Sequence, residues 1–168
     1  MTALEQAINT RVPMSGLVKM INKDQVSFDE TISLAIGDKE PTAWRAAWAL
    51  FHSTKKEDSR LIPFIDQILA VLPFKNDGHQ RELIKLVMKV SLNEQQEGVL
   101  FDCCMSIWEK VGKSPSVRSL AFSFIYLTIQ KYPELKSEIK FLVQEEYVSP
   151  LSPGVRKGVE KKIKRLFG

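Results

Sequence analysis

Residues 41–51 read PTAWRAAWALF: a proline, an arginine four positions later, and a run of small and apolar residues. Similar stretches follow as GHQRELIKLVM (78–88), SPSVRSLAFSF (114–124) and SPGVRKGVEKKI (152–163). Their arginines are separated by 36, 37 and 38 positions and are Arg45, Arg81, Arg118 and Arg156. Proline suits the first turn of a helix, so these stretches predict helices that begin just before each arginine. Recurrence at this period predicts a repeat protein.

The intervals between these stretches also have helical spacing. From Leu61 to Leu72, apolar residues recur at i, i+4, i+7, i+8 and i+11, and residues 99–111 carry a similar stripe. No segment alternates apolar and polar residues with the two-residue period of a strand. The sequence therefore predicts an all-α protein. The expected helices are 2–10, 14–22, 27–37, 41–54, 59–73, 77–92, 95–112, 115–131, 133–147 and 153–167.

On these four stretches, with SRLIPFIDQIL at 59–69 as a first helix, the chain resembles the HEAT repeat family over about residues 27–167. The resemblance implies a right-handed α-α superhelix of about four antiparallel helix pairs. In that arrangement the arginine helices are the second of each pair and line the concave face. Residues 1–26 fit no repeat and are expected to cap the first pair. We expect one helical-repeat domain over residues 1–168.

The arginine row lacks the acidic partners that it often has in the family. HEAT units often carry an aspartate six positions before the arginine, and the two residue types form a ladder. The corresponding residues here are Lys39, Lys75, Gly112 and Pro150.

Length and composition fit a globular domain. The chain has 168 residues, of which 44% are hydrophobic and 26% are charged, which excludes a wholly disordered protein. Its two cysteines, Cys103 and Cys104, are adjacent and cannot build a disulfide framework. No apolar stretch reaches the ~20 residues of a membrane helix, and the first residues lack the pattern of a secretory signal. We therefore expect a cytoplasmic protein without a membrane span.

The positive charge is concentrated in the last predicted helix. The net charge is +4, but residues 154–168 hold six of the 24 Lys and Arg and one acid, so the remaining residues have a net charge of −1. Opposite the apolar positions of this helix lies a candidate basic patch, made of Lys157, Lys161, Lys164 and Arg165. The patch is interpreted either as a solvated face or as a docking site for an acidic protein surface, nucleic acid or anionic lipid.

The sequence predicts no catalytic, cofactor or metal site. It contains no phosphate loop and no GxGxxG, HExxH or GxSxG motif. Its two histidines, His52 and His79, each stand alone, whereas a metal would need several ligands at suitable spacing. Cys103 and Cys104 lie on the apolar stripe, so both are expected to be buried, reduced and free of metal.

Trp44, Trp48 and Phe51 follow the spacing i, i+4, i+7. Such a stripe usually faces a neighbouring helix, so we predict that it packs in the core. An alternative comes from the resemblance to HEAT-like DNA glycosylases, in which aromatic residues act on a flipped base together with a catalytic aspartate. In this chain the acids nearest to the tryptophans in sequence are Asp29 and Asp38.

Two hypotheses for the function are considered in detail, and a third and weakest one is an enzyme whose site has no recognisable motif. The first is a non-enzymatic protein-interaction module whose partner is another protein, with Arg45, Arg81, Arg118 and Arg156 as candidate binding residues. Stacked helical repeats work by presenting an extended surface to a partner. The alternative is a nucleic-acid-binding or DNA-repair protein of the HEAT-like DNA glycosylase type. The net charge of −1 outside the last helix favours the first hypothesis.

Overall fold

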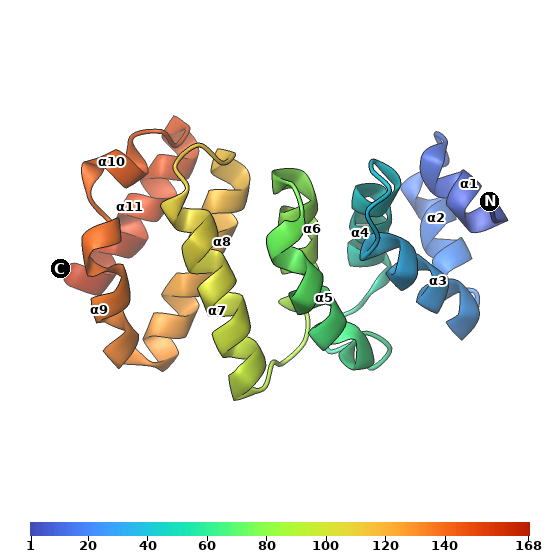
Figure 1. Cartoon of the computed structure of the whole chain (residues 1–168), viewed down its shortest axis with the longest axis horizontal. Coiled ribbons are helices and arrows are strands. Elements are labelled where there is room, and N and C mark those ends of the chain that lie inside the picture. The colour runs from blue at the N-terminus through green and yellow to red at the C-terminus, as the bar shows by residue number, and fades with distance from the viewer. The chain divides into compact units, whose positions relative to one another are not determined.

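A computed structural model describes residues 1–168, and every regular element in it is helical (Figure 1), which confirms the all-α prediction. The chain divides into two compact units, Met1–Leu92 and Asn93–Gly168.

The N-terminal unit is built around α4. Its elements are α1 (Ala3–Asn9), α2 (Met14–Ile21), α3 (Gln25–Ala35), α4 (Thr42–Ser53), the 3-10 helix η1 (Ile62–Phe64), α5 (Ile65–Val71), the 3-10 helix η2 (Leu72–Phe74) and α6 (Asp77–Val87). Helix α4 contacts α1, α2, α3 and α6. Small side chains on α4 allow these helices to approach closely, and the buried ones are Ala43, Ala46, Ala47 and Ala49.

In the C-terminal unit, α8 occupies the central place. The elements are α7 (Glu94–Glu109), α8 (Pro115–Lys131), η3 (Pro133–Leu135), α9 (Lys136–Ile139), η4 (Lys140–Leu142), α10 (Glu145–Val148) and α11 (Pro153–Phe167). Helix α8 packs against α7 and α11. Its buried side chains include Phe122 and Ile125, so it supplies much of this unit's core.

The prediction of one continuous helix over residues 133–147 is wrong. The segment forms η3, α9 and η4, and a separate α10 follows, because the backbone becomes extended at Gln144 (φ −74°, ψ 168°). The carbonyl of Leu142 accepts a hydrogen bond from Trp108 Nε1 at 2.7 Å. The carbonyl of Tyr147 accepts one from Arg118 at 2.8 Å. Trp108 of α7 and Arg118 of α8 thus donate hydrogen bonds to backbone carbonyls of this segment.

Two further predicted helices are shorter than expected. The helix at 59–73 is reduced to α5 with a 3-10 turn at each end, because Pro63 and Pro73 supply no N–H to a continuous α-helical ladder. The helix at 77–92 ends at Val87. Beyond that point the chain turns, and the Nζ of Lys89 donates to the carbonyls of Phe51 and Thr54 at the end of α4.

Two lysines link segments of the N-terminal unit that are far apart in the sequence. Lys39 and Lys75 occupy the positions where HEAT units often have aspartate. Lys39 Nζ lies 2.9 Å from Glu5 Oε1 on α1. Lys75 Nζ donates to the carbonyl of Gly37 at 2.6 Å and to Asp38 Oδ1 at 2.7 Å, in the loop between α3 and α4. These lysines therefore connect neighbouring helix pairs from positions equivalent to the family's acidic ladder.

Asp58 anchors the loop between α4 and α5. Its side chain accepts hydrogen bonds from Nε and Nη2 of Arg60 at 3.0 and 2.8 Å, and from the backbone N–H groups of Lys55 and Arg60. The Arg60 guanidinium also lies over the Phe28 ring, 4.4 Å from its centre. Asp58 is only 1% exposed. The side-chain hydrogen bonds from Arg60 lower the pKa of Asp58 from 3.8 to about 2.

We expect Asp58 to make the stability depend on acid. A carboxyl whose pKa is lower in the folded state stabilises that state above its unfolded pKa, and the contribution is lost as the pH falls through the folded pKa. For Asp58 the contribution is about 2 kcal/mol, and it disappears between about pH 4 and pH 2. Urea unfolding of the wild type and Asp58→Asn over this range measures it. Equal pH slopes for the two proteins would contradict the assignment.

Candidate functional site

The four recurring arginines occupy similar places in their helices. The backbone N–H groups of Arg45, Arg118 and Arg156 each donate to the carbonyl of the residue before the helix begins. In α6 the equivalent bond comes from Gln80, one residue before Arg81. The arginines therefore share a position near the first turn, but their side chains lie in different surroundings.

Arg118 is buried and acts within the fold. Its Nε and Nη2 donate to the carbonyl of Trp108 at 3.2 and 2.9 Å, Nη2 also reaches Tyr147, and the guanidinium lies 4.4 Å from the centre of the Trp108 ring. Its Nη1 is buried without a hydrogen-bond partner. Burial lowers the pKa of Arg118. A side chain with no exposed surface is not available to a partner protein.

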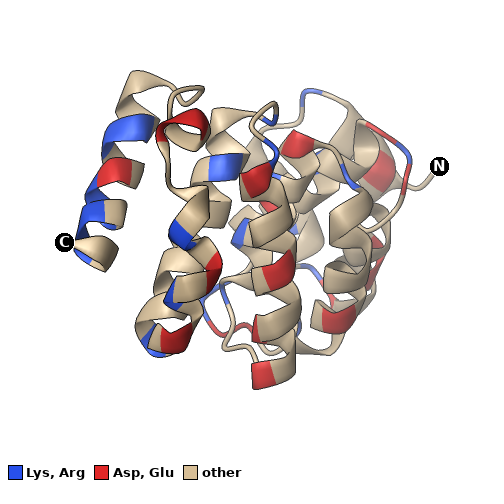
Figure 2. Ribbon diagram, turned by 60° about the vertical axis from the view of Figure 1, so that its left-hand side comes forward, with Lys and Arg blue, Asp and Glu red and all other residues tan.

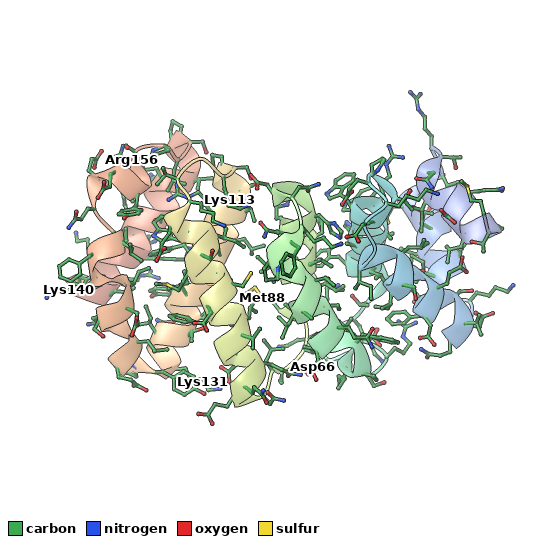
Figure 3. All side chains as sticks on the ribbon, viewed as in Figure 1. Asp66, Met88, Lys113, Lys131, Lys140 and Arg156 are labelled. Carbon is green, nitrogen blue, oxygen red and sulfur yellow. The ribbon has the colours of Figure 1, made fainter.

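The other three arginines are only partly buried. Arg45 Nη1 donates to the carbonyl of Asn9 at 3.4 Å. Arg81 Nη2 lies 3.0 Å from Glu82. Arg156, at the start of α11 (Figure 3), pairs with Glu145 at 2.8 Å and with Glu160 at 2.7 Å. The four guanidinium groups therefore have different partners, and their local surroundings are not equivalent.

The aromatic stripe of α4 lies at the edge of the core and against α6, and is not fully buried as predicted. Trp44, Trp48 and Phe51 are all partly exposed, because the buried face of α4 is formed by its alanines and Leu50. The rings of Trp44 and Trp48 are parallel, with centres 6.2 Å apart and an interplanar angle of 1°. The exposed ring of His52 packs edge-on against Trp48 at 5.6 Å and against Phe51 at 5.4 Å. Four rings thus form a continuous aromatic surface along the helix.

Helix α6 and the turn that follows it each add a lysine to this surface. Lys85 Nζ and Lys89 Nζ each lie 4.1 Å from the centre of the Phe51 ring. Such cation–π contacts contribute about 0.5–2 kcal/mol each, depending on exposure. The first turn of α6 also lies close to Trp44. A Cβ atom at Gly78 would be only 3.3 Å from the indole nitrogen. We call Trp44, Trp48, Phe51, His52, Lys85 and Lys89 the aromatic–lysine surface.

A buried carboxylate holds the cations of α6 in place. Glu82 is fully buried and lies 3.0 Å from Arg81 Nη2 and 3.1 Å from Lys85 Nζ. Burial lowers the pKa of Lys89. Sequence reasoning missed these lysines, although Arg81 and Lys85 are four residues apart on α6 and Lys89 lies two residues beyond its end. The spacing of Arg81 and Lys85 was a usable signal, since it places both on one face of the helix.

The two aspartates considered for catalysis are engaged elsewhere. Asp29 accepts a hydrogen bond from Gln25 Nε2 at 2.7 Å within α3. Asp38 binds Lys75, and that hydrogen bond lowers the pKa of Asp38. Both aspartates thus bind residues outside the aromatic–lysine surface.

The two histidines have separate environments. His52 belongs to the aromatic–lysine surface. His79, in the first turn of α6, is fully buried, with Nε2 2.7 Å from the carbonyl of Ala35 and Nδ1 2.6 Å from Glu40 Oε1. His79 thus ties α6 to the end of α3 and to the residues before α4. No group of three or more His, Cys, Asp and Glu side chains is arranged to hold a metal ion.

Cys103 and Cys104 are buried and unlinked, which confirms the prediction of their burial. Burial raises the pKa of the Cys103 thiol to about 11 and raises that of Cys104 well above its usual value. Since the thiolate is the reactive form, both groups are poor nucleophiles at neutral pH.

We expect a thiol reagent to modify the native protein slowly at pH 7. Both cysteines should react at once after unfolding in urea, because unfolding exposes them and restores an ordinary thiol pKa. Labelling with a chromogenic disulfide, with and without urea, measures the difference. Modification of either cysteine in the native protein at the rate of a free thiol would show that the site opens readily.

The C-terminal helix has the basic face expected of it. Lys157, Lys161, Lys164 and Arg165 are exposed and take part in no ion pair, and the ribbon shows the Lys and Arg positions along α11 (Figure 2). Val159 and Leu166, on the other side of the helix, are buried. The face is therefore solvated and open, as both interpretations of the patch require. No helix of the structure is long and apolar enough to cross a membrane.

Comparison with known proteins identifies the family. The HEAT repeat domain model matches residues 1–166, which is nearly the whole sequence. The chain therefore belongs to the HEAT repeat domain family, and repeats of this kind commonly form scaffolds for protein interactions. Neither the curated proteins nor the solved structures contain a match to the chain.

Proposed function

We propose that the protein is a non-enzymatic, cytoplasmic protein-interaction module that binds a partner through the aromatic–lysine surface. In the proposed arrangement, about four HEAT-like helix pairs stack as a right-handed superhelix capped by residues 1–26, with α4 and α6 among the helices of its concave face. The observation that carries the proposal is the partly exposed aromatic row of α4 with lysines held against Phe51.

Aromatic and cationic groups together suit protein recognition. Tryptophan and arginine are enriched among the residues that dominate binding energy. The large ring of tryptophan buries much area with few rotatable bonds. The partner that complements this surface combines apolar side chains, which cover the rings, with carboxylates, which face Lys85 and Arg81. The proposed role is binding alone, since the surface contains no nucleophile paired with a base.

A second candidate function is binding of single-stranded nucleic acid. The observation that favours it is the parallel pair of Trp44 and Trp48, with Lys85 against the neighbouring Phe51 ring. Bases stack on such rings with about 1–3 kcal/mol per base, and neighbouring lysines attract the phosphates. The net charge of −1 over most of the chain makes this the weaker candidate.

The experiment compares three proteins as bait for binding partners from the native cell. These are the wild type, the double variant Trp44→Ala/Trp48→Ala, and Phe74→Ala. Phe74 is 85% exposed in the same unit but lies outside the surface, so it is the matched control. The proposal expects at least one protein that the wild type and Phe74→Ala retain and the double variant loses.

Two treatments separate the candidate functions. If nuclease releases the bound material and a labelled oligothymidine binds with the same dependence on Trp44 and Trp48, the second candidate replaces the first. Equal retention of every partner by the double variant and the wild type would refute binding through this surface. Circular dichroism checks that the variants keep their helical structure.

A further inference from the structure

A groove in the C-terminal unit lies between α7 and the segment of η3 and α9. It has a volume of about 670 Å³, and Thr128 in the last turn of α8 and Tyr132 just beyond that helix also line it. Its floor is apolar and is formed by Phe101, Met105 and Leu135. Methionine adapts its shape easily, which suits a surface that receives another side chain.

The rim of the groove is acidic. Six carboxylates surround the floor: Glu94, Glu97, Asp102, Glu109, Glu134 and Glu138. Only Glu97 has a cationic partner, Lys131, at 2.8 Å, near the end of the unit where α7 begins (Figure 3). Glu134 and Glu138 are one helical turn apart, a spacing at which like charges repel. A cationic ligand would relieve this repulsion.

We propose that this acidic groove binds a basic amphipathic helix of a partner protein. The inference rests on the proposed function as an interaction module, but it concerns a surface in the other unit of the chain. An apolar row on the partner helix would cover Phe101, Met105 and Leu135. Lysines and arginines on both sides of that row would face the carboxylates of the rim, and a cleft lined by one sign of charge attracts the opposite charge.

The backbone of the groove favours a helical occupant. Its walls are helices, whose backbone groups are bonded within the helix, so they offer no free edge to an extended segment. A helix satisfies its own backbone and can lie on an apolar floor. Glu94 and Glu109 are fifteen residues apart on α7, which corresponds to about 22 Å, or four turns of a partner helix.

A second copy of the chain fits the groove less well. The basic face of α11 matches the rim in charge, but two apolar residues of that helix, Val159 and Leu166, are buried within their own unit. That face would therefore bring Lys157 and Lys161 to the groove with few apolar side chains for the floor. The partner helix has to offer both kinds of residue on the same side.

Fluorescence anisotropy of the full chain with a labelled peptide of about 18 residues tests the proposal. The probe contains only leucine and lysine, arranged so that leucines form one helical face, and a scrambled peptide of the same composition is the control. The wild type should bind the amphipathic peptide about tenfold more tightly than the scrambled one, and salt should weaken the binding. Circular dichroism should show that the peptide becomes helical in the complex.

Charge reversal locates the binding site. Asp102→Lys/Glu138→Lys should weaken binding by about tenfold or more, because both exposed carboxylates lie on the rim. Glu146→Lys, an exposed acid outside the groove, should leave it nearly unchanged. Equal loss in both variants, or equal binding of the scrambled peptide, would overturn the proposal in favour of nonspecific charge attraction.

Two further results keep the alternatives apart. Trp44→Ala/Trp48→Ala should bind the peptide normally, so failure of the groove and failure of the proposed function are separate outcomes. Sedimentation equilibrium of the protein alone tests the second copy as occupant. A dimer that dissociates in Asp102→Lys/Glu138→Lys would assign the groove to self-association and overturn the proposed partner.

Discussion

Replacing Trp108 by alanine should lower the free energy of unfolding by about 3–5 kcal/mol, the range typical of large aromatic residues removed from a core. Trp108 is fully buried, its ring centre lies 4.6 Å from that of Phe122, and its indole N–H donates to Leu142. The substitution therefore leaves a cavity and also an unpaired carbonyl. Urea unfolding followed by circular dichroism measures the loss.

Trp108→Phe is the matched control for this prediction. It keeps most of the apolar volume and removes the hydrogen bond to Leu142, so it should cost about 1–2 kcal/mol. A loss of less than about 1 kcal/mol for Trp108→Ala would mean that the residue lies at the surface, where substitutions rarely cost more.

Replacing Arg118 by methionine should lower the free energy of unfolding by about 2–4 kcal/mol. Methionine keeps much of the apolar stem but removes the donors to the carbonyls of Trp108 and Tyr147, which then lie unpaired. Lysine at this position should recover little, because a single ammonium cannot reproduce the planar guanidinium fork. Urea unfolding of both variants tests this.

Arg165→Met provides the comparison, since Arg165 is exposed and its loss should change stability by no more than about 0.5 kcal/mol. Arg118 and Trp108 are in contact, so the double variant should lose less than the sum of the two single losses. If Arg118→Met is as stable as Arg165→Met but fails to bind a partner, Arg118 is a binding residue and its structural assignment is wrong.

The sequence predicted the helices whose signals are local. Helices α8 and α11 begin at prolines and have continuous apolar faces, and their predicted and observed bounds agree. The interruption within 133–147 depends on Trp108 and Arg118, which are 34 and 29 residues from the carbonyls that they bind. No pattern inside the segment reports such distant hydrogen bonds.

The sequence itself explains why the aromatic stripe of α4 was predicted to lie in the core. Trp44, Trp48 and Phe51 have helical spacing whether they face the core or the solvent. A second set with the same spacing, Ala43, Ala47 and Leu50, forms the neighbouring face, and this set is buried. Several helices converge on α4, and small side chains permit that approach. Comparing the two faces would have assigned the aromatic rings to the surface.

Lys89 has a consequence for the thermodynamics of binding. Its ammonium is fixed between the Phe51 ring and the carbonyls at the end of α4. A free lysine side chain loses up to about 2 kcal/mol of conformational entropy when a partner immobilises it. Folding has already restricted Lys89, so binding at the aromatic–lysine surface requires little further ordering of this residue. The surface is therefore preorganised. Binding of a rigid partner should carry a smaller entropic penalty here than at a surface whose lysines are mobile.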